Sequence, residues 1–115
     1  MTFFVTQKMK PTKNVNSSPT VIFGAAADNL PTCIIGSVLL TNMTSNNISV
    51  SISFKRAEEA YILANQISIL PYATADFFKD FTFTAEKGDQ LYAFSDYSTN
   101  LFNAFVSYET LNETL

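Results

Sequence analysis

The residues of this chain that could do chemistry are a few carboxylates, five tyrosines and one cysteine, because the sequence contains no histidine. Histidine is the commonest general base and the commonest metal ligand in proteins. The one adjacent acidic pair is Glu58-Glu59. Neighbouring side chains on an extended strand point to opposite faces, so these two glutamates cannot share a site. We predict that the chain is not an enzyme and has no catalytic residues.

Four aspartates fall where turns are predicted, and loop carboxylates can gather around a calcium ion. They are Asp76, Asp80, Asp89 and Asp96. Their spacing does not match the calcium-binding loop of an EF-hand, and aspartate is favoured in turns for its own hydrogen bonding. We therefore predict no metal site and no cofactor.

The tyrosines offer an alternative function, since exposed aromatic rings can stack on sugars. They are Tyr61, Tyr72, Tyr92, Tyr97 and Tyr108. No tryptophan accompanies them, and no pair of them is spaced so as to mark a site. A glycan- or ligand-binding module is the alternative function that these residues leave open.

The composition indicates a surface that is partly covered by another chain. Hydrophobic residues make up 47% of the sequence and charged residues only 15%, against about 25% charged residues in typical soluble domains. We expect copies of the chain to contact one another, as a trimer or a ring. The formal charge is -3, and no basic face is visible, so we expect no nucleic-acid partner.

The single cysteine and the apolar runs indicate the cellular compartment in which the protein is made. Cys33 allows no internal disulfide and is predicted to be a small buried hydrophobe. The apolar start at Phe3 to Val5 is followed at once by polar and basic residues, unlike a signal peptide. Other apolar runs are far shorter than the roughly 20 residues that span a bilayer. We expect a soluble protein made in a cytoplasm, with no membrane partner.

Serines alternate with large hydrophobic residues in residues 48–54, which predicts a strand with one solvent-exposed face and one buried face. The segment that follows the charged residues 55–60 is predicted to be a strand, although a short helix is the alternative there. The other segments with strand patterns are 20–23, 32–42, 61–69, 81–84, 91–95 and 101–108. Strands about ten residues apart, with turn signals between them, predict an all-β fold. We predict an antiparallel β-sandwich or jelly roll of about seven or eight strands.

The same alternation predicts which side chains form the core. Within residues 32–42 it places Ile34, Val38 and Leu40 on one face and Ile35 and Leu39 on the other. The predicted core consists of Val38, Leu40, Val50, Ile52, Phe54, Ile67, Ile69, Phe83, Leu91, Phe102 and Val106.

The chain divides into an N-terminal arm (1–19), a β-sandwich domain (20–110) and a C-terminal tail (111–115). The arm has an apolar start and a polar, proline-punctuated remainder. The alternative is that Thr2 to Met9 is a first strand of the same sheet. The residues that we predict to contact other subunits during assembly are Phe3, Phe4, Val5, Phe77 and Phe78.

A series of motifs between Thr20 and Glu109 resembles a known family. The motifs are the turn Thr41-Asn42-Met43-Thr44, the alternating strand Val50 to Phe54, the turn at Pro71, the turn Gly88-Asp89-Gln90-Leu91 and the closing strand Val106-Ser107-Tyr108-Glu109. Their order resembles that in small β-sandwich virion structural proteins of tailed bacteriophages.

The resemblance implies a non-enzymatic accessory subunit that is repeated on a particle, as a capsid decoration or cement protein or as a neck or tail component. It implies other virion proteins and copies of the chain itself as partners, and the virion as the location. The N-terminal segment and the phenylalanines at 77 and 78 depart from the family pattern.

Overall fold

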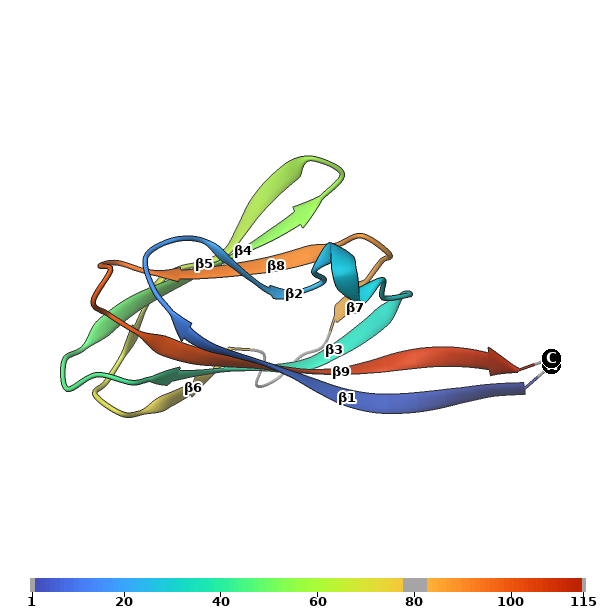
Figure 1. The fold of residues 1–115 in the computed structure, drawn as a ribbon, viewed down its shortest axis with the longest axis horizontal. Coiled ribbons are helices and arrows are strands. Elements are labelled where there is room, and N and C mark those ends of the chain that lie inside the picture. Colours follow the sequence, from blue (N-terminus) through green and yellow to red (C-terminus); the bar gives the residue numbers. More distant parts are fainter. Residues whose placement is uncertain (1, 78–82, 115) are drawn as a thin grey trace.

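Two antiparallel sheets pack face to face in the computed structural model (Figure 1). The structure describes the backbone of residues 2–77 and 83–114 and the side chains of residues 7–77 and 83–110. The first sheet contains, in spatial order, β1 (Thr2–Val15), β9 (Phe102–Thr114), β3 (Cys33–Asn42) and then β6 (Thr74–Asp76) and β7 (Phe83–Ala85), which both pair with β3. The second sheet contains β2 (Thr20–Phe23), β8 (Gln90–Ser95), β4 (Ile48–Arg56) and β5 (Glu59–Ile69).

The predicted all-β sandwich is confirmed. Within the described ranges the only helical element is the short 3-10 turn η1 (Ala26–Asp28). The nine described strands exceed the predicted seven or eight because β6 and β7 are separate short strands on the same side of β3. If these two count as one position, the spatial orders of the two sheets, β1-β9-β3-β6 and β2-β8-β4-β5, are those of an eight-stranded jelly roll.

The core lies between the sheets and contains most of the side chains that the alternation pattern predicts. Eight of the predicted residues are buried: Val38, Leu40, Val50, Ile52, Ile69, Leu91, Phe102 and Val106. Phe54, Ile67 and Phe83 are only partly buried. Phe54 and Phe83 pack against the rim of the core, and Ile67 lies on the edge strand β5.

A β-bulge at Gly36 changes the faces of β3. The pairing of β3 with β9 shifts register between Ile35 and Ser37. As a result Ile35 shares the buried face with Val38 and Leu40, whereas Ile34 is exposed. The predicted grouping of Ile34 with Val38 and Leu40 is therefore wrong, because one extra residue in a strand reverses the alternation beyond it.

The face of β4 that carries the serines is not uniformly exposed to solvent. Ser51 is only 6% exposed, and its hydroxyl oxygen accepts a hydrogen bond from the backbone N–H of Gln66 at 3.0 Å. Gln66 has a positive φ of 54° and lies opposite a register shift between Val50 and Ile52. The side chain of Ser51 thus satisfies a backbone donor that the irregular edge strand leaves unpaired.

The N-terminal segment runs beside the last strand of the chain. β1 pairs with β9 from Thr2 opposite Thr114 to Thr12 opposite Ala104, and Val15 lies in the core. Together the two strands continue past one end of the sandwich (Figure 1). The backbone therefore corresponds to the alternative of a first strand, while the division into an arm, a domain and a tail stays a prediction.

The predicted assembly contacts are only partly visible. The side chains of Phe3, Phe4 and Val5 and the whole of Phe78 lie outside the described residues. Phe77 is partly buried against the core, and its backbone N–H donates to the carbonyl of Val38 at 2.8 Å. A role for these residues in assembly stays a prediction.

Burial of Ile52 gives a direct test of the sandwich. Ile52 is fully buried between Ala64 and Ala93 of the neighbouring strands. Replacing it by alanine should reduce the free energy of unfolding by about 2 to 5 kcal/mol, because the cavity adds to the lost transfer free energy. Denaturant unfolding measures the loss, and an unchanged midpoint would contradict the register of β4.

Candidate assembly surface

The second sheet ends in an edge strand that exposes large apolar side chains. β5 pairs with β4 on one side only, and Tyr61, Ile62 and Leu63 are exposed, Ile62 to 67%. An edge strand with exposed apolar side chains is a site where another chain can attach. Only the turn end of the β4–β5 hairpin projects from the second sheet (Figure 1), because β4 is paired with β8 as far as Lys55.

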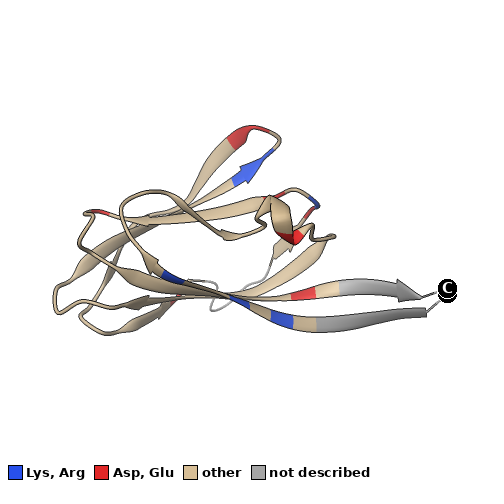
Figure 2. Ribbon diagram, in the orientation of Figure 1, with Lys and Arg blue, Asp and Glu red and all other residues tan. Residues whose placement is uncertain are grey.

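The tip of this hairpin is a tight turn. Arg56 pairs with Glu59, so only Ala57 and Glu58 connect the strands, and both have positive φ (49° and 71°). Two-residue turns of this kind match the right-handed twist of a β-ribbon. Figure 2 shows acidic and basic residues close together at this tip. The charged residues thus lie at the turn, just before the exposed apolar residues of β5.

A buried carboxylate holds the turn end of the hairpin to the body of the sandwich. Asp89 is 4% exposed, and its carboxylate accepts hydrogen bonds from Arg56 Nε at 2.9 Å and Nη2 at 2.6 Å. The backbone N–H of Glu86 donates to the same carboxylate at 2.7 Å. Burial alone would raise the pKa of Asp89, but these hydrogen bonds and the charge of Arg56 outweigh it and lower the pKa below its ordinary value.

Two further contacts fix the position of Asp89 and of the hairpin. A Cβ added to Gly24, which has a φ of 83°, would lie 2.1 Å from the carbonyl oxygen of Asp89, so only glycine fits there. The guanidinium of Arg56 lies 5.1 Å from the ring centre of Phe54. Phe54 in turn contacts Phe83 edge-to-face, at 6.0 Å between ring centres. These contacts therefore fix the turn end of the hairpin against the sandwich.

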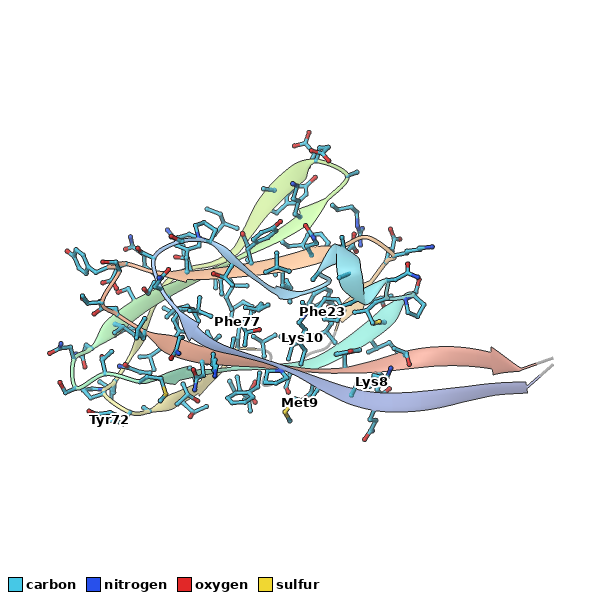
Figure 3. The ribbon with its side chains drawn as sticks, in the orientation of Figure 1. Lys8, Met9, Lys10, Phe23, Tyr72 and Phe77 are labelled. Carbon is cyan, nitrogen blue, oxygen red and sulfur yellow. The ribbon has the colours of Figure 1, made fainter. Side chains whose placement is uncertain are left out.

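A second surface feature lies on the first sheet, on the side that faces away from the core. It is a hollow of about 520 Å³, here called the dimple, lined by Gln7, Lys8, Met9, Ile34, Gly36, Ser107, Tyr108 and Glu109. Met9 and Ile34 are exposed there, Met9 to 59%, and Met9 points away from the sandwich in Figure 3. Gly36 contributes no side chain, so it leaves the hollow open.

Sequence reasoning missed both features. The segment 61–69 was predicted as a strand, but its exposure was not, although consecutive apolar residues at Tyr61, Ile62 and Leu63 cannot all face the core of a strand. A glycine within an apolar strand, such as Gly36, is a known signal for a bulge or a close approach. That signal could have indicated the dimple.

The aspartates that could have gathered around a cation are separated or have other partners. Asp89 is bound to Arg56, and Asp80 lies outside the described residues. Asn100 donates to Asp96 at 2.8 Å, and this hydrogen bond lowers the pKa of Asp96. In the described part of the chain, no three histidine, cysteine, aspartate or glutamate residues lie close enough together to hold a metal ion.

The five tyrosines do not form a single sugar-stacking platform. Tyr108 is buried and packs edge-to-face on Phe23 at 5.1 Å. Tyr92 is partly buried, and its hydroxyl donates to Gln90 at 2.8 Å. The exposed residues Tyr61, Tyr72 and Tyr97 lie on β5, in the β5–β6 turn and in the β8–β9 loop. The tyrosines therefore do not come together in one sugar-binding site.

The cysteine lies in the core, and its thiol is kept neutral. Cys33 is 2% exposed, and its sulfur lies 3.2 Å from the carbonyl of Pro31, to which it donates. Burial raises the pKa of the thiol, and the charge of Lys8 opposes this only in part. Among the described residues, no helix has the length and apolar character needed to cross a membrane.

Comparison with known proteins finds one solved structure that matches nearly the whole chain. It is described as "Bacillus endospore appendages form a novel family of disulfide-linked pili". The match has a TM-score of 0.62 and covers 98% of this chain and 93% of that one, at 11% sequence identity. No family model and no curated protein matches the sequence. At this identity the likeness establishes a shared fold.

The prediction that this chain is a virion protein of a tailed phage is wrong, because its fold matches that of an endospore appendage chain. The same finding corrects the predicted roles in capsid decoration, cement, neck or tail, the virion location and the partnership with other virion proteins. The motifs whose order resembled the phage family are turns and short segments of strands. Such signals recur wherever a chain forms a sandwich of this kind, so they carry no information about the assembly.

The Asp89 contacts predict how stability depends on pH. Replacing Asp89 by asparagine should reduce the free energy of unfolding by about 1 to 3 kcal/mol at neutral pH, because the charge-assisted hydrogen bonds are lost. Since the pKa of Asp89 is lowered in the folded state, its stabilisation is present above the ordinary carboxyl pKa of 3.8 and is lost as the pH falls through the lower folded value.

Thermal unfolding of both chains between neutral and strongly acidic pH measures this effect. The difference between the wild type and Asp89→Asn should shrink as the pH falls below the ordinary pKa. A difference that stays constant over this range would show that the ionised form of Asp89 does not hold the hairpin.

Proposed function

We propose that this chain is a non-enzymatic structural subunit that polymerises with copies of itself into a pilus-like fibre. The observation that carries the proposal is the edge strand β5, whose exposed apolar residues lie on the free edge of the second sheet. Side chains of this kind are stabilised when a second chain covers them. The low content of charged residues, 15%, agrees with a surface that is covered in an assembly.

The likeness to an appendage pilin supports the same function. That structure belongs to pili described as disulfide-linked, and its fold extends over almost the whole of this chain. The chain is also elongated, with extents of 52 × 28 × 24 Å. An elongated jelly roll with different surfaces on its two sheets suits an open chain of subunits.

Assembly of this chain would differ from a disulfide-linked pilus in its chemistry. A fibre that links each subunit covalently to two neighbours needs at least two cysteines in each subunit, and the sequence has one, which is buried. The contacts between copies of this chain are therefore non-covalent in the proposal.

Purified chain should form open-ended oligomers or fibres as its concentration rises. Apolar burial at the contact drives the association, so the mass should grow with concentration instead of stopping at one closed species. Light scattering and negative-stain electron microscopy measure this growth.

The control is the same experiment with a reducing agent and with Cys33→Ala. Both should leave the oligomers intact, because no disulfide holds them. A chain that remains monomeric at every concentration tested would contradict the proposed function, and oligomers that dissolve on reduction would contradict the non-covalent contact.

A further inference from the structure

Most of β1 is attached to the sandwich without being part of its core. The strand lies at the edge of the first sheet, pairs with β9 only, and continues with it past one end of the sandwich (Figure 1). None of residues 7–14, whose side chains the structure describes, is buried, whereas Val15, the last residue of the strand, lies in the core. The part of β1 before Val15 is therefore held by its ladder with β9 and by contacts at the surface.

The described side chains of β1 that face the core are polar. Lys8, Lys10 and Thr12 lie opposite residues of β9 that are buried in the core, at positions 108, 106 and 104. Residues directly opposite each other on paired strands point to the same side of a sheet. These three polar side chains thus take places where a strand of a sandwich usually carries apolar ones. Apolar burial therefore contributes little to the attachment of this part of β1.

Two side-chain contacts that hold this part of β1 are also polar. Lys10 forms an ion pair with Asp28 of η1, and Gln7 donates a hydrogen bond to Glu109 at 3.2 Å. Ion pairs that stay partly exposed to solvent contribute little to stability. Both contacts, like the backbone ladder, form equally well when β1 and β9 belong to different copies of the chain.

A hinge separates this part of β1 from its anchored end. The regular pairing with β9 runs over residues 2–12 and shifts register before Val15. Asn14, between them, has a φ of 57°, a left-handed conformation that an extended strand does not need. After this hinge Val15 is buried, and the carbonyl of Asn16 accepts a hydrogen bond from the backbone N–H of Ser95 at 2.8 Å. Rotation at Asn14 therefore moves residues 2–12 as a unit and leaves the anchored end in place.

We propose that residues 2–12 of one copy, here called the exchange segment, pair with β9 of the next copy in place of that copy's own β1. The partner is a second copy of this chain, because β9 already binds this sequence in this register and exchange reproduces the same contacts between copies. The inference rests on the proposed function, since it names the link between successive subunits. Each copy gives its exchange segment to one neighbour and receives one from the other, so the chain of subunits stays open.

Two singly substituted chains test whether β1 and β9 pair between copies. Met9 and Ser107 lie opposite each other in the ladder, and such pairs have Cα separations of about 4.5 to 5.5 Å, which suit a disulfide. Met9→Cys and Ser107→Cys are each made with Cys33→Ala, mixed in denaturant, refolded together and oxidised. We expect a mixed disulfide, because the substituted residues meet only when β1 of one chain pairs with β9 of the other.

A second pair of chains is the matched control for this disulfide. Ser98→Cys takes the place of Ser107→Cys, since Ser98 is exposed in the β8–β9 loop and lies outside the ladder. Mass spectrometry identifies a mixed disulfide when one of the two chains carries an isotope label. The control pair should give none beyond what random collision produces.

One chain that carries both cysteines tests whether the exchange drives association. Met9→Cys with Ser107→Cys and Cys33→Ala, oxidised at high dilution, locks β1 onto β9 of the same chain. The locked chain should associate at least about tenfold more weakly than the same chain after reduction, which corresponds to about 1.4 kcal/mol. Sedimentation velocity measures both forms.

Substitution at the hinge should shift the balance between the closed and the exchanged form. Valine is strongly disfavoured at positive φ and suits an extended strand, so Asn14→Val should strengthen self-association. Asn14→Gly is the matched control, because glycine adopts the left-handed conformation without steric cost, and it should not strengthen self-association. Equal association of the two variants would contradict the hinge.

The outcomes separate this inference from the proposed function. A wild-type chain that does not associate, or that stops at a dimer, overturns both. A wild-type chain that forms larger oligomers overturns the exchange alone if the mixed disulfide is missing, or if the locked chain associates as strongly as its reduced form. A mixed disulfide with Ser107→Cys but not with Ser98→Cys, together with weaker association of the locked chain, supports the exchange.

Discussion

The buried carboxylate of Asp89 is the interaction on which the candidate assembly surface depends. It joins the turn before β8 to Arg56, the last residue of β4 before the hairpin turn. Gly24 leaves just enough room for the backbone of this turn. β4 pairs with β8 only as far as Lys55, so the ion pair holds the hairpin at the point where this pairing ends. The ion pair gives the hairpin a fixed direction, so its apolar residues are presented at little entropic cost.

Two of the edge strands, β1 and β5, are interrupted, and this favours a contact through side chains. β5 has register shifts opposite Val50 and Ile52, and β1 contains Pro11, which has no N–H to donate. Bulges and prolines are common means of preventing uncontrolled pairing of edge strands.

The sequence predicts most of the fold because its main signals are local. Alternation in β4 and in the segment that forms β8 predicts both strands, and turn residues predict where they end. The face of Ile34 could not be predicted, since the bulge at Gly36 arises from the pairing with β9. The exposed edge strand and the dimple were missed for the same reason, because Ile62 and Gly36 become exposed only through the tertiary arrangement. The Arg56–Asp89 contact was missed because the two residues are far apart in the sequence.

Self-association of the purified chain tests the central claim most directly, because a second copy should cover the exposed apolar residues of β5. Ile62→Thr keeps the β-branched shape and removes most of the apolar character, and Leu70→Thr is the matched control, since Leu70 is similarly exposed but lies after β5. We predict that sedimentation velocity shows weaker association of Ile62→Thr than of the wild type and unchanged association of Leu70→Thr. Equal association of all three chains would contradict the account.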